Sequence, residues 1–266
     1  MKAAQLFDVS GLVTIVTGGA SGIGLGYCEV MADNGARVFA FDRDAAALKT
    51  PPKGITGIVA DVTHKAGLEK AFDDVAAQAG RIDVVFVNAG IGGGPGWLRA
   101  GEDTRNEERA FEDLPAEQWA QVMATNVTGA FTTIQAAARH MKPNRSGRII
   151  VTSSCSAYKT EQYVGTPYVV SKAAVAHMVR QSAHELAAYG ITVNAIAPGP
   201  VITNISGGRL KDAETRKPFE KIIPMHRLGT PEDLQGLALF LASPASAYIT
   251  GVNILIDGGF TLGPAD

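Results

Sequence analysis

Cysteine is scarce in this chain of 266 residues, which contains only Cys28 and Cys155. Two cysteines cannot form the disulfide framework of a small secreted domain, and these two lack the spacing of a metal site. Charge of one sign is also lacking: the net charge of −2 argues against nucleic acid or an anionic membrane as the partner. No apolar run approaches the ~20 residues of a transmembrane helix, and residues 1–10 lack the apolar core of a signal peptide. We therefore expect a cytoplasmic protein.

What is present indicates a substantial hydrophobic core. Hydrophobic residues make up 46% of the chain and charged residues 19%. A chain of this length can form one large α/β domain or two small ones. Because no internal repeat, low-complexity segment or linker divides it, we expect residues 1–266 to form a single domain.

A glycine-rich segment at residues 17–24, Thr-Gly-Gly-Ala-Ser-Gly-Ile-Gly, is the most informative stretch. It follows an apolar strand predicted over residues 12–16 and precedes a helix predicted over residues 25–32. A strand, a glycine turn and a helix bring unpaired N–H groups and a positive helix terminus together, which attracts phosphate. We expect a dinucleotide to bind there, although a glycine-rich βα turn without a ligand is the alternative. The residues of the turn expected to contact it are Gly18, Ser21, Gly22, Ile23 and Gly24.

An acidic residue ends the second predicted strand, over residues 37–41. Asp42 lies 20 residues after Gly22, about where dinucleotide-binding folds carry the acid that binds ribose hydroxyls. Its charge would repel a 2′-phosphate, which favours NAD over NADP. Arg43 is the counter-argument, because a guanidinium could accommodate that phosphate, and Asp42 could also serve only the turn.

Strand patterns alternate with helical patterns along the rest of the chain. Further strands are predicted over residues 55–60, 82–87, 148–152, 191–197 and 252–256. This alternation predicts a doubly wound α/β fold, with a mostly parallel sheet covered by helices on both faces. The glycine turn after the first strand argues against a (β/α)₈ barrel.

Two stretches lack a regular pattern, at residues 91–114 and 204–229. The first combines a glycine-rich turn with a charged segment, and the second is polar and rich in Gly, Lys and Glu. Long loops in a compact domain are usually functional. We expect the first to wall the substrate site, although it could be a solvated insertion, and the second to be an irregular, mobile lid.

Tyr168 and Lys172 lie four residues apart, on one face of a predicted helix that Thr166 would cap and Pro167 would begin. A neighbouring ammonium favours the phenolate, so we expect the pKa of Tyr168 to fall from its usual ~10. A tyrosine of that kind can transfer protons. Another helix, starting near Pro115, carries Asn126 on an apolar stripe. A polar side chain in that place is expected to have a hydrogen-bonding partner.

Together these stretches resemble the short-chain dehydrogenase/reductase family over nearly the whole chain. The matching motifs are Thr17-Gly18-x-x-x-Gly22-Ile23-Gly24, Asp61-Val62, Asn88-Ala89-Gly90, Asn126, Tyr168-x-x-x-Lys172 and Pro198-Gly199. The resemblance implies a seven-stranded Rossmann-type sheet and an NAD(P)-dependent oxidoreductase of alcohols and carbonyls. It also implies a homotetramer.

The resemblance assigns a role to each matching residue. Tyr168 would be the acid/base, Lys172 would hold the nicotinamide ribose, and Asn126 would position a water linked to Lys172. The remaining cofactor contacts would come from the ends of several strands: Asp61 and Val62 at the adenine, Asn88, Ala89 and Gly90 at the adenosine side, and Pro198, Gly199, Val201 and Thr203 toward the nicotinamide carboxamide.

The substrate-binding serine departs from the family pattern. It usually precedes the tyrosine by thirteen positions, where this chain has Cys155. We choose Ser154, since it follows the strand at residues 148–152 and a hydroxyl donates a better hydrogen bond than a thiol. Ser153 is the less favoured choice.

The leading hypothesis is an NAD-dependent enzyme that interconverts a small secondary alcohol and a ketone. The alternative is a regulator that senses NADH without turnover. No metal is expected, because His177 and His184 lie about two helical turns apart. The residues alone do not identify the alcohol or ketone.

Overall fold

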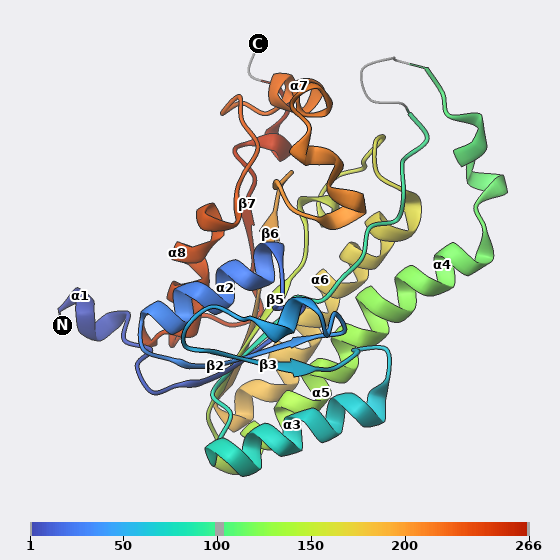
Figure 1. Ribbon diagram of the computed structural model, residues 1–266. Coiled ribbons are helices and arrows are strands. Elements are labelled where there is room, and N and C mark those ends of the chain that lie inside the picture. Colours follow the sequence, from blue (N-terminus) through green and yellow to red (C-terminus); the bar gives the residue numbers. More distant parts are fainter. Residues whose placement is uncertain (1, 99–103, 265–266) are drawn as a thin grey trace.

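One sheet of seven parallel strands organises the structure. The computed structural model describes residues 2–98 and 104–264. The strand order is β3-β2-β1-β4-β5-β6-β7, and every pairing in the sheet is parallel (Figure 1). The strands are β1 (Val13–Thr17), β2 (Arg37–Asp42), β3 (Ile55–Val59), β4 (Val84–Val87), β5 (Gly147–Thr152), β6 (Ile191–Pro198) and β7 (Asn253–Ile256).

Helices cover the two faces of this sheet (Figure 1). They are α1 (Ala3–Leu6), α2 (Gly22–Asp33), α3 (Lys65–Ala79), α4 (Ala116–Met123), α5 (Gly129–Met141), α6 (Thr166–Leu186), α7 (Ala213–Ile222) and α8 (Pro231–Ala242). The predicted doubly wound α/β class is therefore confirmed, and each predicted strand is present with ends shifted by at most two residues.

Successive strand residues point to opposite faces, which explains the continuous apolar runs in the sequence. In β1, Ile15 packs with α3, α5 and α6 on one face, whereas Val16 packs with α2 and α8 on the other. Both side chains are fully buried. The chain winds outward from β1 toward β3 and then returns through β4, so the strand order reverses between β1 and β4. Ligands bind in the crevice at such a reversal, beyond the carboxyl ends of the strands.

The helix predicted from Pro115 is interrupted by a π-helical turn. Pro115 is the N-cap of α4, and the π turn (Ala124–Thr128) joins α4 to α5. Asn126 lies within this turn and is buried. Single π turns widen a helix locally and often mark functional positions.

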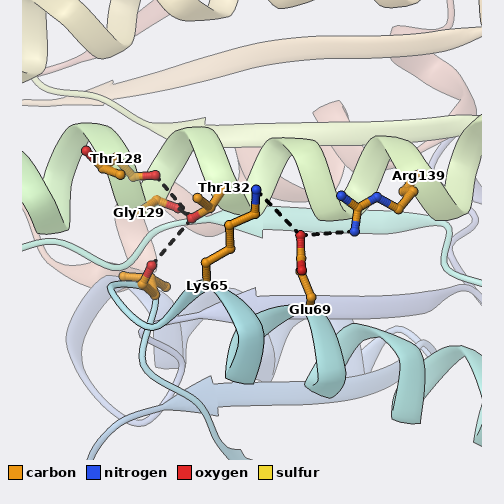
Figure 2. Close-up of polar contacts among 7 residues, drawn as sticks. Lys65, Glu69, Thr128, Gly129, Thr132 and Arg139 are labelled. Carbon is orange, nitrogen blue, oxygen red and sulfur yellow. Dashed lines mark hydrogen bonds and ion pairs between the residues drawn. The ribbon is translucent and has the colours of Figure 1, made fainter.

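Polar contacts join α5 to α3 and to the turn that precedes α3 (Figure 2). The Glu69 carboxylate lies 3.9 Å from the Lys65 ammonium and 3.0 Å from the Arg139 guanidinium. The Thr132 hydroxyl lies 3.4 Å from the carbonyl oxygen of Val62. Surface ion pairs of this kind contribute at most about 1 kcal/mol each. The contact from Thr132 holds Val62, which lines the crevice.

Two local predictions are wrong. Residues 204–229 are not irregular: they contain a 3₁₀ segment (Ile205–Lys211) and helix α7, whose N-cap Asp212 accepts a hydrogen bond from the Thr215 N–H. The single proline in α7 and its polar composition hid the helical pattern. Thr166 does not cap α6 either, because Gly165 occupies the N-cap position and Thr166 is the first helical residue. The helix can begin one residue earlier because Pro167, near its start, has no N–H to satisfy.

The described residues contain neither a membrane-spanning helix nor a cluster of metal-ligating side chains. Over residues 2–98 and 104–264, no helix combines the length and apolar character needed to cross a bilayer. Over the same residues, no group of three or more His, Cys, Asp or Glu side chains could hold a metal ion.

Candidate active site

A cavity of about 660 Å³ lies at the carboxyl ends of the strands, where the strand order reverses. Every residue predicted to contact the cofactor lines it except Gly24. These lining residues are Gly18, Ser21, Gly22, Ile23, Asp42, Arg43, Asp61, Val62, Asn88, Ala89, Gly90, Tyr168, Lys172, Pro198, Gly199, Val201 and Thr203. The fold thus brings together in one cavity segments that are up to 185 positions apart in the chain, from Gly18 to Thr203.

The glycine turn is too tight for side chains at two positions. Gly18 has φ of +66°, and a Cβ there would lie 3.0 Å from the Cα of Ala89. A Cβ on Gly24 would lie 2.1 Å from the Gly18 carbonyl oxygen. Gly24 therefore does not line the cavity because it packs directly beneath the turn. Its absence of a side chain lets α2 approach the turn closely.

The start of α2 suits a phosphate. Its N-cap Ser21 makes no side-chain capping bond, so the first-turn N–H groups remain directed at the cavity. The helix dipole adds positive potential at the same place. A pyrophosphate fits these N–H donors because it is an anion, whereas a cation would be repelled by them.

A chain of hydrogen bonds links the glycine turn to Lys172. The Asn88 side-chain amide donates to the carbonyl oxygens of Thr17 and Gly18, at 3.2 and 3.3 Å. The Thr152 hydroxyl donates to the Asn88 side-chain oxygen at 3.0 Å, and the Lys172 ammonium donates to the Thr152 carbonyl oxygen at 2.9 Å. Thr17 begins the glycine motif, but neither its contacts nor the role of Thr152 could be read from the sequence, because both depend on neighbours brought in by other strands.

Asp42 occupies the far end of the cavity, at the end of β2. Its two carboxylate oxygens accept hydrogen bonds from the N–H groups of Ala20, at 3.2 Å, and Asp44, at 3.0 Å. A carboxylate offers about four acceptor sites, so capacity remains for the hydroxyls of a ribose. Arg43 lines the same part of the cavity.

Asn126 joins two segments rather than facing the cavity. Its side chain donates to the carbonyl oxygen of Ile91 at 3.0 Å and accepts from the Ile91 N–H at 2.8 Å. It also donates to the Ser171 hydroxyl at 3.0 Å, which in turn donates to the Tyr168 carbonyl oxygen. The Asn126 side chain therefore has the hydrogen-bonding partners that its place on an apolar stripe led us to expect. These bonds also fix the backbone next to Tyr168 and Lys172.

The predicted fall in the pKa of Tyr168 is wrong for this structure. Burial raises the pKa of Tyr168 to about 12. A hydrogen bond with Ser154 opposes this rise in part, and the nearby Cys155 and Glu161 add to it. The Lys172 ammonium lies 5.5 Å from the centre of the tyrosine ring and gives its hydrogen bond to Thr152. Burial also lowers the pKa of Lys172 to about 8, which weakens the positive charge that would stabilise a phenolate. Desolvation therefore outweighs the pairing expected from the spacing of four residues.

Replacing Lys172 with Met should change how stability depends on pH. The unfolded chain holds the lysine proton up to about pH 10.5, whereas the folded protein releases it near pH 8. Stability of the native protein relative to Lys172→Met should therefore rise between pH 8 and 10.5, by an amount on the order of 3 kcal/mol. Urea unfolding of both proteins across this range measures the difference. If the free energies of unfolding of the two proteins changed in parallel with pH, the claim that Lys172 is a buried ammonium with a lowered pKa would be contradicted.

The three candidates for the substrate-binding position differ in where their side chains are engaged. The Ser153 hydroxyl bonds to the Ile196 carbonyl and to Asn253, away from Tyr168. Ser154 lines a second cavity together with Tyr168, and its hydroxyl lies 3.1 Å from that of Ser156. Cys155 lines the same cavity, but burial raises the pKa of its thiol to about 12. Of the three, Ser154 offers the best donor beside Tyr168.

Of the loop predicted over residues 91–114, Ile91 and Gly92 line the first cavity and Gly92 also lines the second. Pro95 pairs with Val164 as an antiparallel bridge, and the Gly165 N–H donates to the Gly94 carbonyl oxygen. Residues 99–103 of that prediction lie outside the described residues. Two aromatic side chains near these cavities pack against other residues: Trp97 against Arg105 and Tyr163 against Phe219.

The second cavity, of about 110 Å³, adjoins the first at Tyr168. Glu161 and Arg209 line it, although neither carried a readable signal in the sequence. A dinucleotide-sized crevice, a tyrosine–lysine pair and an adjoining small cavity define a nucleotide-dependent oxidoreductase.

Comparison with known proteins identifies the family. A family model described as enoyl-(acyl carrier protein) reductase matches residues 18–261. The chain is 34% identical over 262 residues to an NAD-dependent glycerol dehydrogenase of Listeria innocua, covering 96% of each protein. It is 35% identical over 273 residues to a galactitol 2-dehydrogenase (L-tagatose-forming) of Cereibacter sphaeroides, covering 98% of this chain and 100% of that one. The chain belongs to the short-chain dehydrogenase/reductase family.

A solved structure agrees with the fold over the same extent. The crystal structure of a gluconate 5-dehydrogenase from Burkholderia cenocepacia, in complex with NADP and tartrate, superposes with a TM-score of 0.86 at 30% identity. The match covers 98% of this chain and 99% of that one. The Rossmann-type sheet and the family resemblance expected from the motifs are thus confirmed.

Proposed function

We propose that this protein interconverts a secondary alcohol and a ketone by hydride transfer, using NAD(H). The observation that carries the proposal is the meeting of two cavities at Tyr168: one of dinucleotide size that begins at the glycine turn, and a small one lined by Ser154. The relatives are named as dehydrogenases, which supports turnover. They lend no support to the alternative, a sensor without turnover.

In this proposal, separate residues transfer the proton, bind the substrate oxygen and hold the cofactor. The bound dinucleotide supplies or accepts the hydride. Tyr168 gives its phenolic proton to the carbonyl oxygen during reduction and takes a proton from the alcohol during oxidation. Ser154 donates a hydrogen bond to the same substrate oxygen. Lys172 holds the nicotinamide ribose, and Asn126 fixes the backbone around both residues.

The remaining predicted residues hold the cofactor. The turn and the start of α2 bind the pyrophosphate, while Asp42 accepts from the adenosine ribose. Asp61 and Val62 border the adenine, and Asn88, Ala89 and Gly90 line its ribose side. Pro198, Gly199, Val201 and Thr203 lie toward the nicotinamide. We propose NAD rather than NADP, because the Asp42 carboxylate would repel a 2′-phosphate.

Replacing Asp42 with Ala should shift the cofactor preference toward NADP. Removing the carboxylate eliminates the repulsion and leaves Arg43 to attract the 2′-phosphate, so the ratio of kcat/KM for NAD over NADP should fall at least about tenfold. Steady-state kinetics with both cofactors measures the ratio. Asp74→Asn, an exposed substitution on α3, serves as the control and should leave the preference unchanged. A native preference for NADP would refute the role given to Asp42.

A substrate screen tests the reaction itself. NADH absorbance is followed with alcohols in one direction and ketones in the other, starting with polyols and sugar acids because the relatives are named for glycerol, galactitol and gluconate. Turnover that requires Tyr168 supports the proposal. Tight NADH binding without turnover across the screen would favour the sensor.

We also propose that residues 1–266 form a single domain and act in the cytoplasm as a homotetramer. Exposed apolar side chains on helices and near the C-terminus, such as Phe131, Val170 and Leu262, support an assembly. Sedimentation equilibrium measures its mass, and a monomer at micromolar concentration would contradict it.

A further inference from the structure

The small cavity beside Tyr168 has a mostly apolar lining that also includes two charged side chains. Its apolar lining includes Val164, Leu210, Phe219 and Phe260, and its charged lining consists of Glu161 and Arg209. A cavity built only for a hydrocarbon ketone would not place a carboxylate and a guanidinium in its lining, because desolvating each charge is costly.

The Glu161 side chain is half-buried, and its carboxylate has few hydrogen-bonding partners. Within the part of the chain that the structure describes, its one hydrogen-bonding partner is the Cys155 thiol, at 3.8 Å. A thiol is a weak donor, and a carboxylate has about four acceptor sites. The nearby Lys159 is engaged elsewhere: its ammonium donates to the Phe260 carbonyl oxygen at 3.4 Å and lies 3.8 Å from the centre of the Phe260 ring. Glu161 therefore has acceptor capacity directed at the cavity.

Arg209 offers the complementary capacity. One of its amino groups donates to the Tyr163 carbonyl oxygen at 3.1 Å. A guanidinium has five N–H donors, and among residues 2–98 and 104–264 no carboxylate forms an ion pair with this one. Glu161 and Arg209 thus line one cavity without neutralising each other, so that an acceptor and a donor both remain for a ligand.

We propose that the substrate is polyhydroxylated, with Glu161 accepting a hydrogen bond from a hydroxyl other than the reacting one and Arg209 donating to a further oxygen. This inference rests on the proposed alcohol–ketone reaction and narrows its substrate class. Glu161 is then a specificity-determining residue. Substrates that lack the second hydroxyl leave its carboxylate unpaired, which a site built for hydrogen bonding rejects strongly.

A four-carbon series isolates the effect of the added hydroxyls. The compounds are 2-butanol, 1,3-butanediol, 2,3-butanediol and erythritol, oxidised with NAD by the native protein, Glu161→Gln and Glu161→Leu. The native kcat/KM should rise at least about tenfold from the mono-alcohol to the best polyol. Glu161→Gln should reduce this ratio, and Glu161→Leu should abolish it by lowering kcat/KM for the polyols much more than for 2-butanol. Glu185→Gln, exposed at the far end of α6, should retain the native ratio.

Each outcome decides between the two proposals. A native protein that oxidises mono-alcohol and polyol equally well, or a preference that survives in Glu161→Leu, overturns the inference and leaves the alcohol–ketone reaction standing. A uniform loss for all four compounds indicates a structural role for Glu161 and also overturns it. If none of the four is oxidised, the reaction proposal loses support, and calorimetric binding of the same compounds to the NADH-loaded protein decides the inference. Recognition of polyols that depends on Glu161 supports it, and its absence overturns it.

Discussion

Replacing Tyr168 with Phe should nearly abolish turnover while NADH binding is retained. The substitution removes only the hydroxyl that exchanges a proton with the substrate oxygen, and positioned acid/base groups contribute about 10²–10⁴-fold to the rate. The ring itself lines the dinucleotide cavity and remains in place. We therefore expect kcat to fall by that factor in both directions, with the dissociation constant for NADH changed less than about threefold. Stopped-flow turnover and NADH fluorescence measure the two quantities.

A second tyrosine provides the control for this experiment. Tyr189→Phe removes a hydroxyl from a partly exposed ring at the end of α6, far along the helix from Tyr168. It should retain native turnover. Full activity in Tyr168→Phe would refute the proton transfer assigned to this residue. Loss of NADH binding in the same variant would instead indicate a damaged cavity.

Replacing Gly24 with Ala should impair both stability and dinucleotide binding. The added methyl group would lie 2.1 Å from the Gly18 carbonyl oxygen and 2.5 Å from the Asn88 side-chain nitrogen. Neither the turn nor Asn88 can yield easily, since Asn88 is hydrogen-bonded to Thr17, Gly18 and Thr152. Such overpacking costs about 1–3 kcal/mol or more in the free energy of unfolding. The displaced turn should also weaken NADH binding at least about tenfold.

Another helical glycine supplies a matched control. Gly236 lies exposed in α8, and a Cβ there would meet no described heavy atom within 4 Å beyond its chain neighbours and the adjacent backbone of its own helix. Gly236→Ala should stabilise the protein by about 1 kcal/mol through helix propensity, without a change in NADH affinity. Chemical unfolding and fluorescence titration compare the two variants. Equal effects of both substitutions would contradict a specific steric role for Gly24.

The sheet was predictable because its strands are short apolar runs separated by helical patterns. The glycine turn and the spacing of Tyr168 and Lys172 were equally readable, since each rests on residues close together in the chain. Helix α7 was not readable, because its pattern is polar and interrupted by Pro218. The cap of α6 was missed for a different reason: Thr166 is a good capping residue, but the backbone begins the helix after Gly165.

The electrostatics of the site could not be derived from spacing. A tyrosine and a lysine four residues apart on a solvated helix would interact mainly with each other. Here Lys172 is buried and bonded to Thr152, while burial of Tyr168 raises the pKa of its hydroxyl, with smaller contributions from Cys155 and Glu161. These neighbours come from segments whose position depends on the whole fold. The same holds for Arg209, whose approach to the cavity follows from the placement of the segment before α7.

The hydrogen-bonded chain from Gly18 through Asn88 and Thr152 to Lys172 has a consequence for protein engineering. All four residues come from strand ends or from α6, and the chain passes through neither of the loops that bound the small cavity. Neither the segment that carries Arg209 nor the one that carries Glu161 contributes a partner to these bonds, so replacing either segment leaves them in place. Substrate range can therefore be altered by exchanging these segments between homologues, while the hydrogen bonds that join the glycine turn to Lys172 are retained.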